Sequence, residues 1–234
     1  MSPESAALEP PVPVLFEDAH VLVVFKPPGW IVQGARPDDP SLLATLRAWI
    51  RTRDAKPGEA FLAVVHRLDR PVCGVVVFAK RSKAASRLSD EIRTRRFEKA
   101  YRAIVEGTPA ASQATLAGRI AWDDPARRAR MVAGGELGQD AELRYSTVET
   151  RGRHSLLSVE LVTGRKHQIR AQLAAAGHPV AGDSLYGSDT PLGDVALCAW
   201  EVAFGHPTRR EDQVRVAVPA ALDPFPGWWA EIGG

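Results

Sequence analysis

The sequence has few residues of the kinds that build disulfide frameworks, metal clusters or membrane spans. Cysteine occurs only twice in 234 residues, as Cys73 and Cys198, which excludes a disulfide framework and a zinc site made of cysteine pairs. No apolar run approaches the roughly 20 residues that are needed to cross a bilayer. The first residues lack the basic flank and the apolar centre of a signal peptide. We therefore expect a cytoplasmic protein with no membrane segment and no metal.

The overall charge is nearly balanced, since 30 Lys and Arg face 28 Asp and Glu. The resulting net charge of +2 does not by itself predict binding to nucleic acid. The local distribution is more informative, because residues 81–102 hold eight basic side chains against three acidic ones. Such a stretch is either a solvated basic helix face or a surface that contacts phosphates.

Length and composition predict one sizeable domain or two small ones. An apolar share of 45% and a charged share of 25% are ordinary for a globular protein with a full core. We interpret residues 1–13 as a flexible N-terminal tail and residues 14–234 as a single domain. Most of the domain has strand-like patterns, and two longer helices are predicted over residues 41–53 and 82–95, with Ser41 and Ser82 as their N-caps.

A charged turn flanked by two short apolar segments lies at residues 64–80, and Asp69 stands within it. A carboxylate buried in such a place is costly unless a partner compensates it. Arg67 and Arg70 are cations close in sequence, and they favour the ionised form of the aspartate. An ionised, oriented carboxylate can act as a nucleophile or as an electrostatic stabiliser. The simpler interpretation is a turn residue whose side chain binds its own backbone.

Further patterns accompany this turn. They are Lys-Pro-Pro-Gly at 26–29, Lys-Ala-Tyr at 99–101, Gly-Arg-Lys-His-Gln-Ile-Arg at 164–170, Pro-Val-Ala-Gly-Asp at 179–183 and Tyr-Gly at 186–187. The pattern at 164–170 leads into a short predicted helix, and helical spacing places Lys166 and Arg170 on one face.

Together with His-Arg-Leu-Asp at 66–69, these patterns resemble the RluA-type pseudouridine synthases. The resemblance covers about residues 14–220, and we expect no S4-type RNA-binding domain ahead of it. It implies an α+β fold with a mixed, mainly antiparallel curved sheet, flanking helices and a basic active-site cleft. The strand-rich pattern with a few helices agrees independently with that class.

The activity implied by the resemblance is the isomerisation of uridine to pseudouridine within RNA, without a cofactor. Asp69 would be the catalytic carboxylate, and whether it attacks the ribose, attacks the base or removes a proton stays open. Tyr101 would stack on the target base, and Arg170 would pair with Asp69. Arg67 would occupy the gap left by the flipped nucleotide.

The expected partner is RNA, as a stem-loop of rRNA or tRNA, and the protein is expected to act as a monomer. The resemblance assigns RNA contacts to residues 164–170, called the third motif below, and to their surroundings. A long segment at 122–139, predicted to be an exposed hairpin or loop, adds clustered arginines. The expected RNA-binding residues are Arg67, Lys99, Arg128, Arg130, Arg165, Lys166 and His167.

The chain departs from the family pattern inside the catalytic turn, where Val72 and Cys73 replace the usual Thr-Ser pair. The lost hydroxyls remove possible hydrogen bonds. Two alternatives therefore stay open. The chain could be an RNA-binding module that has lost catalysis, or a hydrolase that uses Asp69 as nucleophile. A hydrolase of that kind normally has a second carboxylate as general acid. Asp183 is a candidate, but it fits better as the structural Gly-Asp pair that the resemblance implies.

Overall fold

The computed structural model describes residues 9–34, 40–55, 57–134, 136–209 and 211–233. The chain divides into a first unit, residues 1–97 and 203–216, and a second unit, residues 98–202 and 217–234. Residues 1–8 of the expected tail lie outside the described residues. Val12 is only 3% exposed, and the Pro13 carbonyl accepts a hydrogen bond from the N–H of Phe25, so packing begins before the first strand.

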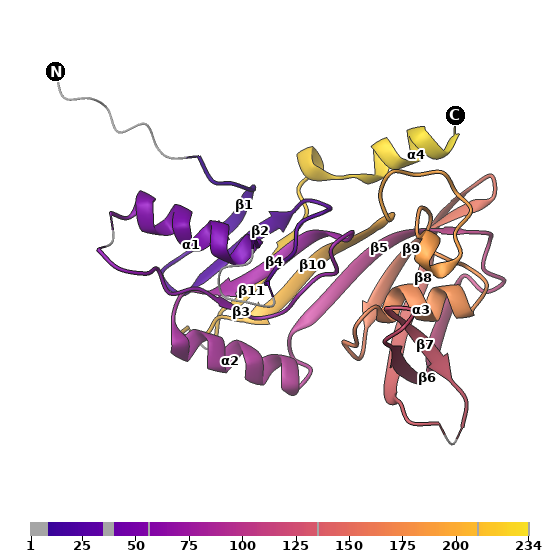
Figure 1. The fold of residues 1–234 in the computed structure, drawn as a ribbon, viewed down its shortest axis with the longest axis horizontal. Helices are drawn as coiled ribbons and strands as arrows, with labels where there is room; N and C mark the ends of the chain where they lie inside the picture. The colour runs from indigo at the N-terminus through magenta and orange to yellow at the C-terminus, as the bar shows by residue number, and fades with distance from the viewer. Residues whose placement is uncertain (1–8, 35–39, 56, 135, 210, 234) are drawn as a thin grey trace. The chain divides into compact units, whose positions relative to one another are not determined.

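The first unit contains β1 (Val14–Glu17), β2 (Val21–Lys26), β3 (Ala63–Val64) and β4 (Cys73–Ala79). β2 pairs antiparallel with β1 and β4, and β3 pairs with β4. Every residue of β2 and β4 is buried, which explains their continuous apolar sequences. This unit also contains the helices α1 (Leu42–Arg53) and α2 (Ser82–Arg93), and α2 packs on β4 and β3 (Figure 1).

The two predicted helix caps have different outcomes. Ser41 is confirmed as the N-cap of α1, and its side chain accepts a hydrogen bond from the N–H of Ala44 at 3.3 Å. The prediction for Ser82 is wrong, because Ser82 is already the first helical residue of α2. Arg81 has the extended backbone of an N-cap, with φ −145° and ψ 146°, but its side chain makes no capping bond.

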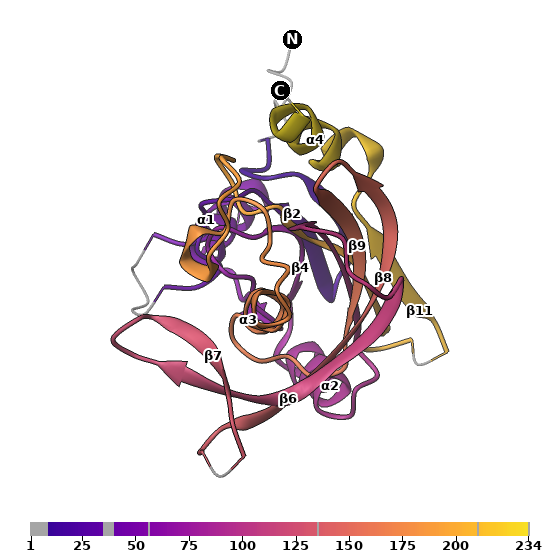
Figure 2. The ribbon, with the colours of Figure 1, turned by 90° about the vertical axis from the view of Figure 1, so that its right-hand side faces the viewer.

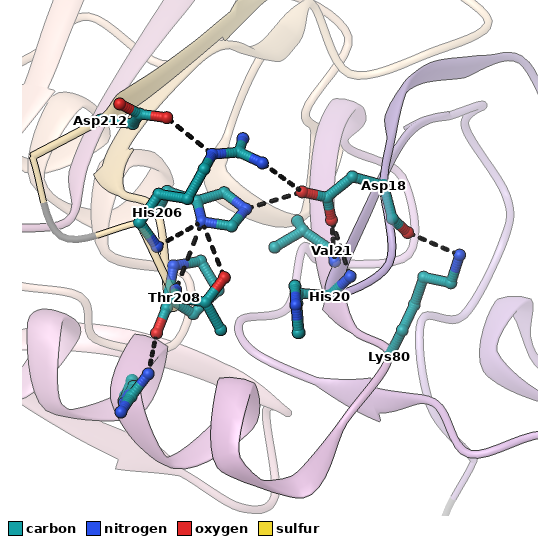
Figure 3. A network of polar contacts seen from close by, with 10 residues as sticks. Asp18, His20, Val21, Lys80, His206, Thr208 and Asp212 are labelled. Carbon is teal, nitrogen blue, oxygen red and sulfur yellow. Dashed lines mark hydrogen bonds and ion pairs between the residues drawn. The ribbon is translucent and has the colours of Figure 1, made fainter.

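A polar network joins His206 to the turn after β1 (Figure 3). His206 Nε2 lies 2.6 Å from Asp18 Oδ2, and His206 Nδ1 accepts a hydrogen bond from the N–H of Arg209 at 3.0 Å. Asp18 Oδ1 accepts hydrogen bonds from the N–H groups of His20 and Val21 at 2.7 and 2.8 Å. Since Nδ1 accepts, the ring proton lies on Nε2 and is donated to Asp18. The network therefore holds together segments of the first unit that are distant in sequence.

The second unit is an antiparallel sheet in the strand order β5-β9-β8-β6-β7. Its strands are β5 (Glu98–Glu106), β6 (Gln113–Asp123), β7 (Arg128–Val132), β8 (Gln139–Arg151) and β9 (His154–Leu161). The sheet curves around α3 (Gln168–Ala175), which Figure 2 shows end-on inside the bend. The expected α+β class with a mainly antiparallel curved sheet is confirmed, and the segment at 122–139 includes β7 as one arm of a hairpin with β6.

α3 is an unusual helix because its buried positions include polar side chains. Gln168 Nε2 donates to the Glu142 carbonyl at 3.0 Å, and Gln172 Nε2 donates to the Leu116 carbonyl at 2.9 Å. Buried amides need such acceptors. The two glutamines therefore fasten the helix to β8 and β6 with a defined orientation, which fixes the direction of every other side chain on it.

The C-terminal part of the chain completes both units. β10 (Leu197–Gly205) and β11 (Gln213–Ala217) contribute residues to each of them, and the short helices η1 (Ser184–Tyr186) and η2 (Ala220–Leu222) belong to the second. α4 (Phe225–Gly233) buries Phe225, Trp228 and Trp229. The guanidinium carbon of Arg102 lies 3.7 Å from the centroid of the Trp200 ring, so this arginine of the basic stretch packs as a cation on an aromatic face.

Two features are absent from the described ranges. No helix in them is long and apolar enough to cross a membrane. No group of three or more His, Cys, Asp or Glu side chains among these residues is placed to hold a metal ion. Both cysteines are buried, as expected for small apolar side chains.

Candidate functional site

Asp69 lies where the sequence predicts it, on the turn between β3 and β4. Its side chain is half-buried, and its neighbours Leu68 and Val72 are buried. The Asp69 carbonyl accepts a hydrogen bond from the N–H of Val72 at 3.1 Å, which closes the turn. Gly74 has a φ of 119°, a value that residues with a side chain rarely adopt. The backbone conformation of the turn therefore sets the position of the Cα atom that carries the Asp69 side chain.

The loop after β2 braces this turn. The N–H of Gly29 donates to the Arg70 carbonyl at 2.9 Å, and Arg70 Nε donates back to the Gly29 carbonyl at 3.0 Å. Lys26, which is fully buried, adds a hydrogen bond from Nζ to the Arg70 carbonyl at 3.1 Å. The Lys-Pro-Pro-Gly motif therefore supports the turn that carries Asp69. The sequence singles out this motif, but nothing in it assigned Lys26 a role.

His66 and Arg67 precede Asp69 and differ in their surroundings. His66 Nε2 accepts a hydrogen bond from the N–H of Val77 at 3.2 Å, and its ring centroid lies 5.5 Å from that of Phe97. These contacts support a packing role for His66. Arg67 is exposed, which is compatible with its proposed contact with RNA.

β5 carries Lys99 and Tyr101 on one face of its sheet, because strand residues two apart point the same way. Tyr101 is 7% exposed and stands opposite Val159 of β9. Lys99 is half-buried, and loss of solvent lowers the pKa of its ammonium group. A Cβ placed on Gly164 would lie 3.2 Å from Lys99 Nζ. Gly164, which begins the third motif, therefore makes room for Lys99 of the Lys-Ala-Tyr motif.

Arg170 forms a two-pronged ion pair with Asp183 inside the second unit. Arg170 Nε lies 2.6 Å from Asp183 Oδ2, and Nη2 lies 2.7 Å from Oδ1. The two side chains are only 4% and 1% exposed. A matched geometry of this kind is what a buried pair of charges needs. Sequence reasoning did not assign this partner to Arg170, and the predicted pairing with Asp69 stays a prediction.

Asp183 was also the candidate general acid for the hydrolase alternative. Both of its carboxylate oxygens accept hydrogen bonds from Arg170. A general acid must instead direct a proton at the leaving group. The geometry of Asp183 therefore removes the support that the sequence gave to a hydrolase.

Aromatic rings surround the third motif. His167 Nδ1 lies 2.9 Å from the Tyr186 hydroxyl oxygen, which also accepts a hydrogen bond from the N–H of Ala129 at 2.8 Å. The Trp122 and His167 rings pack edge to face with centroids 5.2 Å apart. Lys166 Nζ lies 3.2 Å from the Trp122 ring centroid, a cation–π contact that holds the ammonium in place. Trp122 and Tyr186 were not among the predicted site residues.

The predicted helical face shared by Lys166 and Arg170 is wrong. α3 begins at Gln168, and His167 before it has a left-handed φ of 56°. Lys166 therefore belongs to the turn that enters the helix. The reversal of the backbone at His167 is what sends Lys166 toward Trp122 and leaves Arg170 for Asp183.

The other predicted RNA-binding arginines are exposed and differ in their partners. Arg128 Nη1 and Arg165 Nε each donate to a backbone carbonyl, at 3.2 and 3.0 Å, which orients the side chains without neutralising them. Arg130 Nη2 lies 2.7 Å from a carboxylate oxygen of Glu136, so its charge is partly offset. Arg128 and Arg165 therefore suit phosphate contacts better than Arg130.

Comparison with known proteins adds an independent finding. The sequence matches the family model described as RNA pseudouridylate synthase over residues 20–175. The RNA pseudouridine synthase YhcT of Bacillus subtilis is 35% identical over 202 residues, which cover 85% of this chain and 65% of that protein. Ribosomal large subunit pseudouridine synthase C of Haemophilus influenzae is 32% identical over 206 residues, 85% of this chain and 62% of that protein. The chain thus spans less than two thirds of these relatives.

The fold has a close counterpart among solved structures. Human RNA pseudouridylate synthase domain containing 1 superposes with a TM-score of 0.75 at 24% sequence identity. The match covers 96% of this chain and 89% of that one. It establishes a shared fold over nearly the full length described above.

Proposed function

This chain belongs to the RNA pseudouridylate synthase family, and on that premise we propose that it isomerises uridine to pseudouridine within RNA. In this reaction the glycosidic bond to N1 of uracil breaks, the base turns, and C5 bonds to the same ribose carbon. C5 then loses its proton and N1 takes one up, so the product is an isomer of uridine. The observation that carries the proposal is the braced turn that holds Asp69. A carboxylate on a backbone fastened from two sides has the fixed starting position that catalysis requires.

Three side chains are proposed to serve this one reaction. Asp69 acts as the carboxylate that attacks the ribose or the base, or that removes a proton. Tyr101 holds the target base, since flipped bases are commonly read against aromatic rings. Arg170 is proposed to orient the Asp69 carboxylate by pairing with its charge. Its ion pair with Asp183 holds its guanidinium rigidly, which supports a role in orientation.

The proposed substrate is a structured region of rRNA or tRNA. The protein is proposed to act on it in the cytoplasm and as a monomer. The name of the relative from Haemophilus influenzae refers to the large ribosomal subunit, which makes rRNA the first substrate to examine. Arg67, Lys99, Arg128, Arg165, Lys166 and His167 are proposed to contact the RNA, with Arg130 contributing less because Glu136 offsets it.

The proposal is tested by sequence-resolved mapping of pseudouridine in total RNA from cells with and without this gene. We expect one or a few uridines to lose their modification in the deletion strain and to regain it with the wild-type gene. Complementation with an Asp69→Asn gene is expected to restore nothing. An unchanged map would refute the activity, and RNA binding without a changed map would favour the binding-module alternative.

The salt dependence of RNA binding tests the arginine cluster of the hairpin. Replacing Arg127, Arg128 and Arg130 together by glutamine is expected to flatten the plot of log affinity against log salt. Each phosphate contact on a single strand contributes roughly 0.7 to the slope, so the loss should lie between about 0.7 and about 2. Arg51→Gln, at an exposed position of α1 outside the proposed contacts, is the control. An unchanged slope would show that the cluster is only a solvated surface.

Gly164→Ala tests whether the third motif makes room for Lys99. The added methyl group would press on Lys99 Nζ, so we expect RNA affinity to fall by roughly threefold to tenfold, the size of one weakened charged contact. The control is Gly193→Ala, because a Cβ at Gly193 meets no atom within 4 Å. Both variants are compared in the same binding titration and thermal melt. Equal affinities for the two variants would contradict the assignment.

A further inference from the structure

Lys26 stands at the end of β2 and is fully buried, with 0% of its surface exposed. Its Nζ lies 3.0 Å from the carbonyl oxygens of Pro27 and Trp30 and 3.1 Å from that of Arg70. An ammonium group has three N–H donors, and here each of them has a carbonyl acceptor. A buried ammonium without acceptors is costly, and the three carbonyls remove that cost. In turn, the ammonium group supplies each carbonyl with a hydrogen-bond donor.

We propose that Lys26 is a positioning residue for Asp69, and that turnover requires its ammonium group to stay protonated. The inference rests on the proposed function. Two of the three acceptors lie on the loop that follows β2, whereas the third is the carbonyl of the residue directly after Asp69. One buried cation therefore ties the supporting loop to the catalytic turn.

The other contacts of this turn predict which property changes when the cation is lost. Gly29 and Arg70 exchange two further hydrogen bonds, N–H to carbonyl at 2.9 Å and Nε to carbonyl at 3.0 Å. These bonds do not involve Lys26, and they keep the loop and turn together in its absence. We therefore expect a looser carboxylate on an intact fold. Such a change lowers the catalytic rate and leaves the binding of RNA, which depends on many contacts, nearly as it was.

The ammonium group is placed where its proton is easily lost. Burial lowers the pKa of Lys26 to about 8, and electrostatic interactions with Cys73 and Asp69 partly oppose that shift. Asp69 faces the lysine from the turn and Cys73 from β4, and the turn also carries the cation of Arg70. A neutral amine has one donor fewer for three carbonyls and no charge to attract Asp69. Deprotonation is therefore expected to loosen the turn.

The same pKa predicts that stability and activity move in opposite directions with pH. The pKa of Lys26 is about 8 in the folded protein and 10.5 in a solvated lysine. Between these values the unfolded chain binds the proton more tightly, so the contribution of Lys26 to the free energy of unfolding rises with pH. Turnover should fall over the lower part of that window. A loss of activity through unfolding would instead lower both.

The first experiment follows the rate of pseudouridine formation at saturating RNA from about pH 7 to about pH 9. The probe is an in vitro transcript of the region identified by mapping. For wild type we expect the rate to fall about tenfold with a midpoint near pH 8, as for one group with that pKa. Lys26→Met should have a flat rate, tenfold or more below that of wild type at pH 7, with no alkaline fall and with unchanged RNA affinity.

The matched control is Lys80→Met. Lys80 is a second largely buried lysine of the first unit, paired with Glu17 and bound to the Asp18 carbonyl. Its loss is expected to reduce stability and to leave the alkaline fall in place. If Lys26→Met does not fold, Lys26→Arg replaces it, and its permanent charge should abolish the alkaline fall. An alkaline fall that persists in the Lys26 variants overturns the inference.

The second experiment does not depend on catalysis. Amide hydrogen exchange at one pH compares Gly29, whose N–H binds the Arg70 carbonyl, with Val23 in the middle of β2. In Lys26→Met we expect protection at Gly29 to fall about tenfold and protection at Val23 to be retained. If wild type forms no pseudouridine, the proposed function fails, whereas this exchange still decides whether Lys26 clamps the turn. Unchanged protection at Gly29 overturns the clamp.

Discussion

Asp69→Asn is expected to abolish pseudouridine formation and to leave the protein folded. The amide has nearly the size of the carboxylate, but it carries no charge and can neither attack a carbon centre nor take up a proton as a carboxylate does. The turn is closed by backbone carbonyls of Asp69 and Arg70, which the substitution retains. Thermal stability and RNA affinity should therefore stay close to those of wild type.

The measurement is single-turnover formation of pseudouridine, with a thermal melt and an RNA titration on the same samples. Asp212→Asn is the control, because Asp212 is an exposed aspartate of the first unit that is paired with Arg209. It should lose no activity. Substantial turnover by Asp69→Ala would contradict both the nucleophile and the general-base assignments and would leave the family resemblance without its catalytic residue.

Arg170→Ala is expected to have the largest effect on stability. The substitution leaves Asp183 charged and without its two-pronged partner at a position that is 1% exposed. Removing one member of a buried ion pair costs about 3–5 kcal/mol in unfolding free energy. Arg170→Lys keeps the charge but loses the planar fork, so it should cost less stability. We expect it to lower the catalytic rate strongly and RNA affinity little, because one charge among many changes binding little.

A double-mutant cycle identifies the partner of Arg170. If the pair with Asp183 dominates, Arg170→Ala combined with Asp183→Ala should recover much of the stability that Arg170→Ala alone loses. The stability of each variant is measured by denaturant unfolding. A coupling energy near zero would mean that the two side chains do not stabilise each other.

The same cycle with Asp69→Ala, followed by turnover and by unfolding, tests the pairing of Arg170 with Asp69 that the family resemblance implies. A coupling energy near zero there would remove Asp69 as a partner of Arg170, even if Asp69 proved catalytic. Because the two cycles share the Arg170→Ala variant, they rank the two carboxylates directly.

The sequence by itself determined the elements of the fold and the place of Asp69, because these depend on local signals. The short apolar segment that follows the Asp69 turn has a strand-like pattern, and β4 there is buried throughout. The hydroxyl of Ser41 predicted the start of α1 for a reason confined to a few neighbouring residues. The family motifs, each a short run of residues, were recognisable for the same reason.

Only the tertiary structure decided which side chains meet. Lys26 reaches the carbonyl of Arg70, 44 residues away, and Arg170 pairs with Asp183, 13 residues away. Sequence patterns describe backbone preference and burial, whereas an ion pair depends on where separate elements bring their side chains. The left-handed turn at His167 shows the difference, since one backbone reversal sends Lys166 away from the helical face that its spacing predicted. Partners of buried charges are therefore set by packing, which no local pattern records.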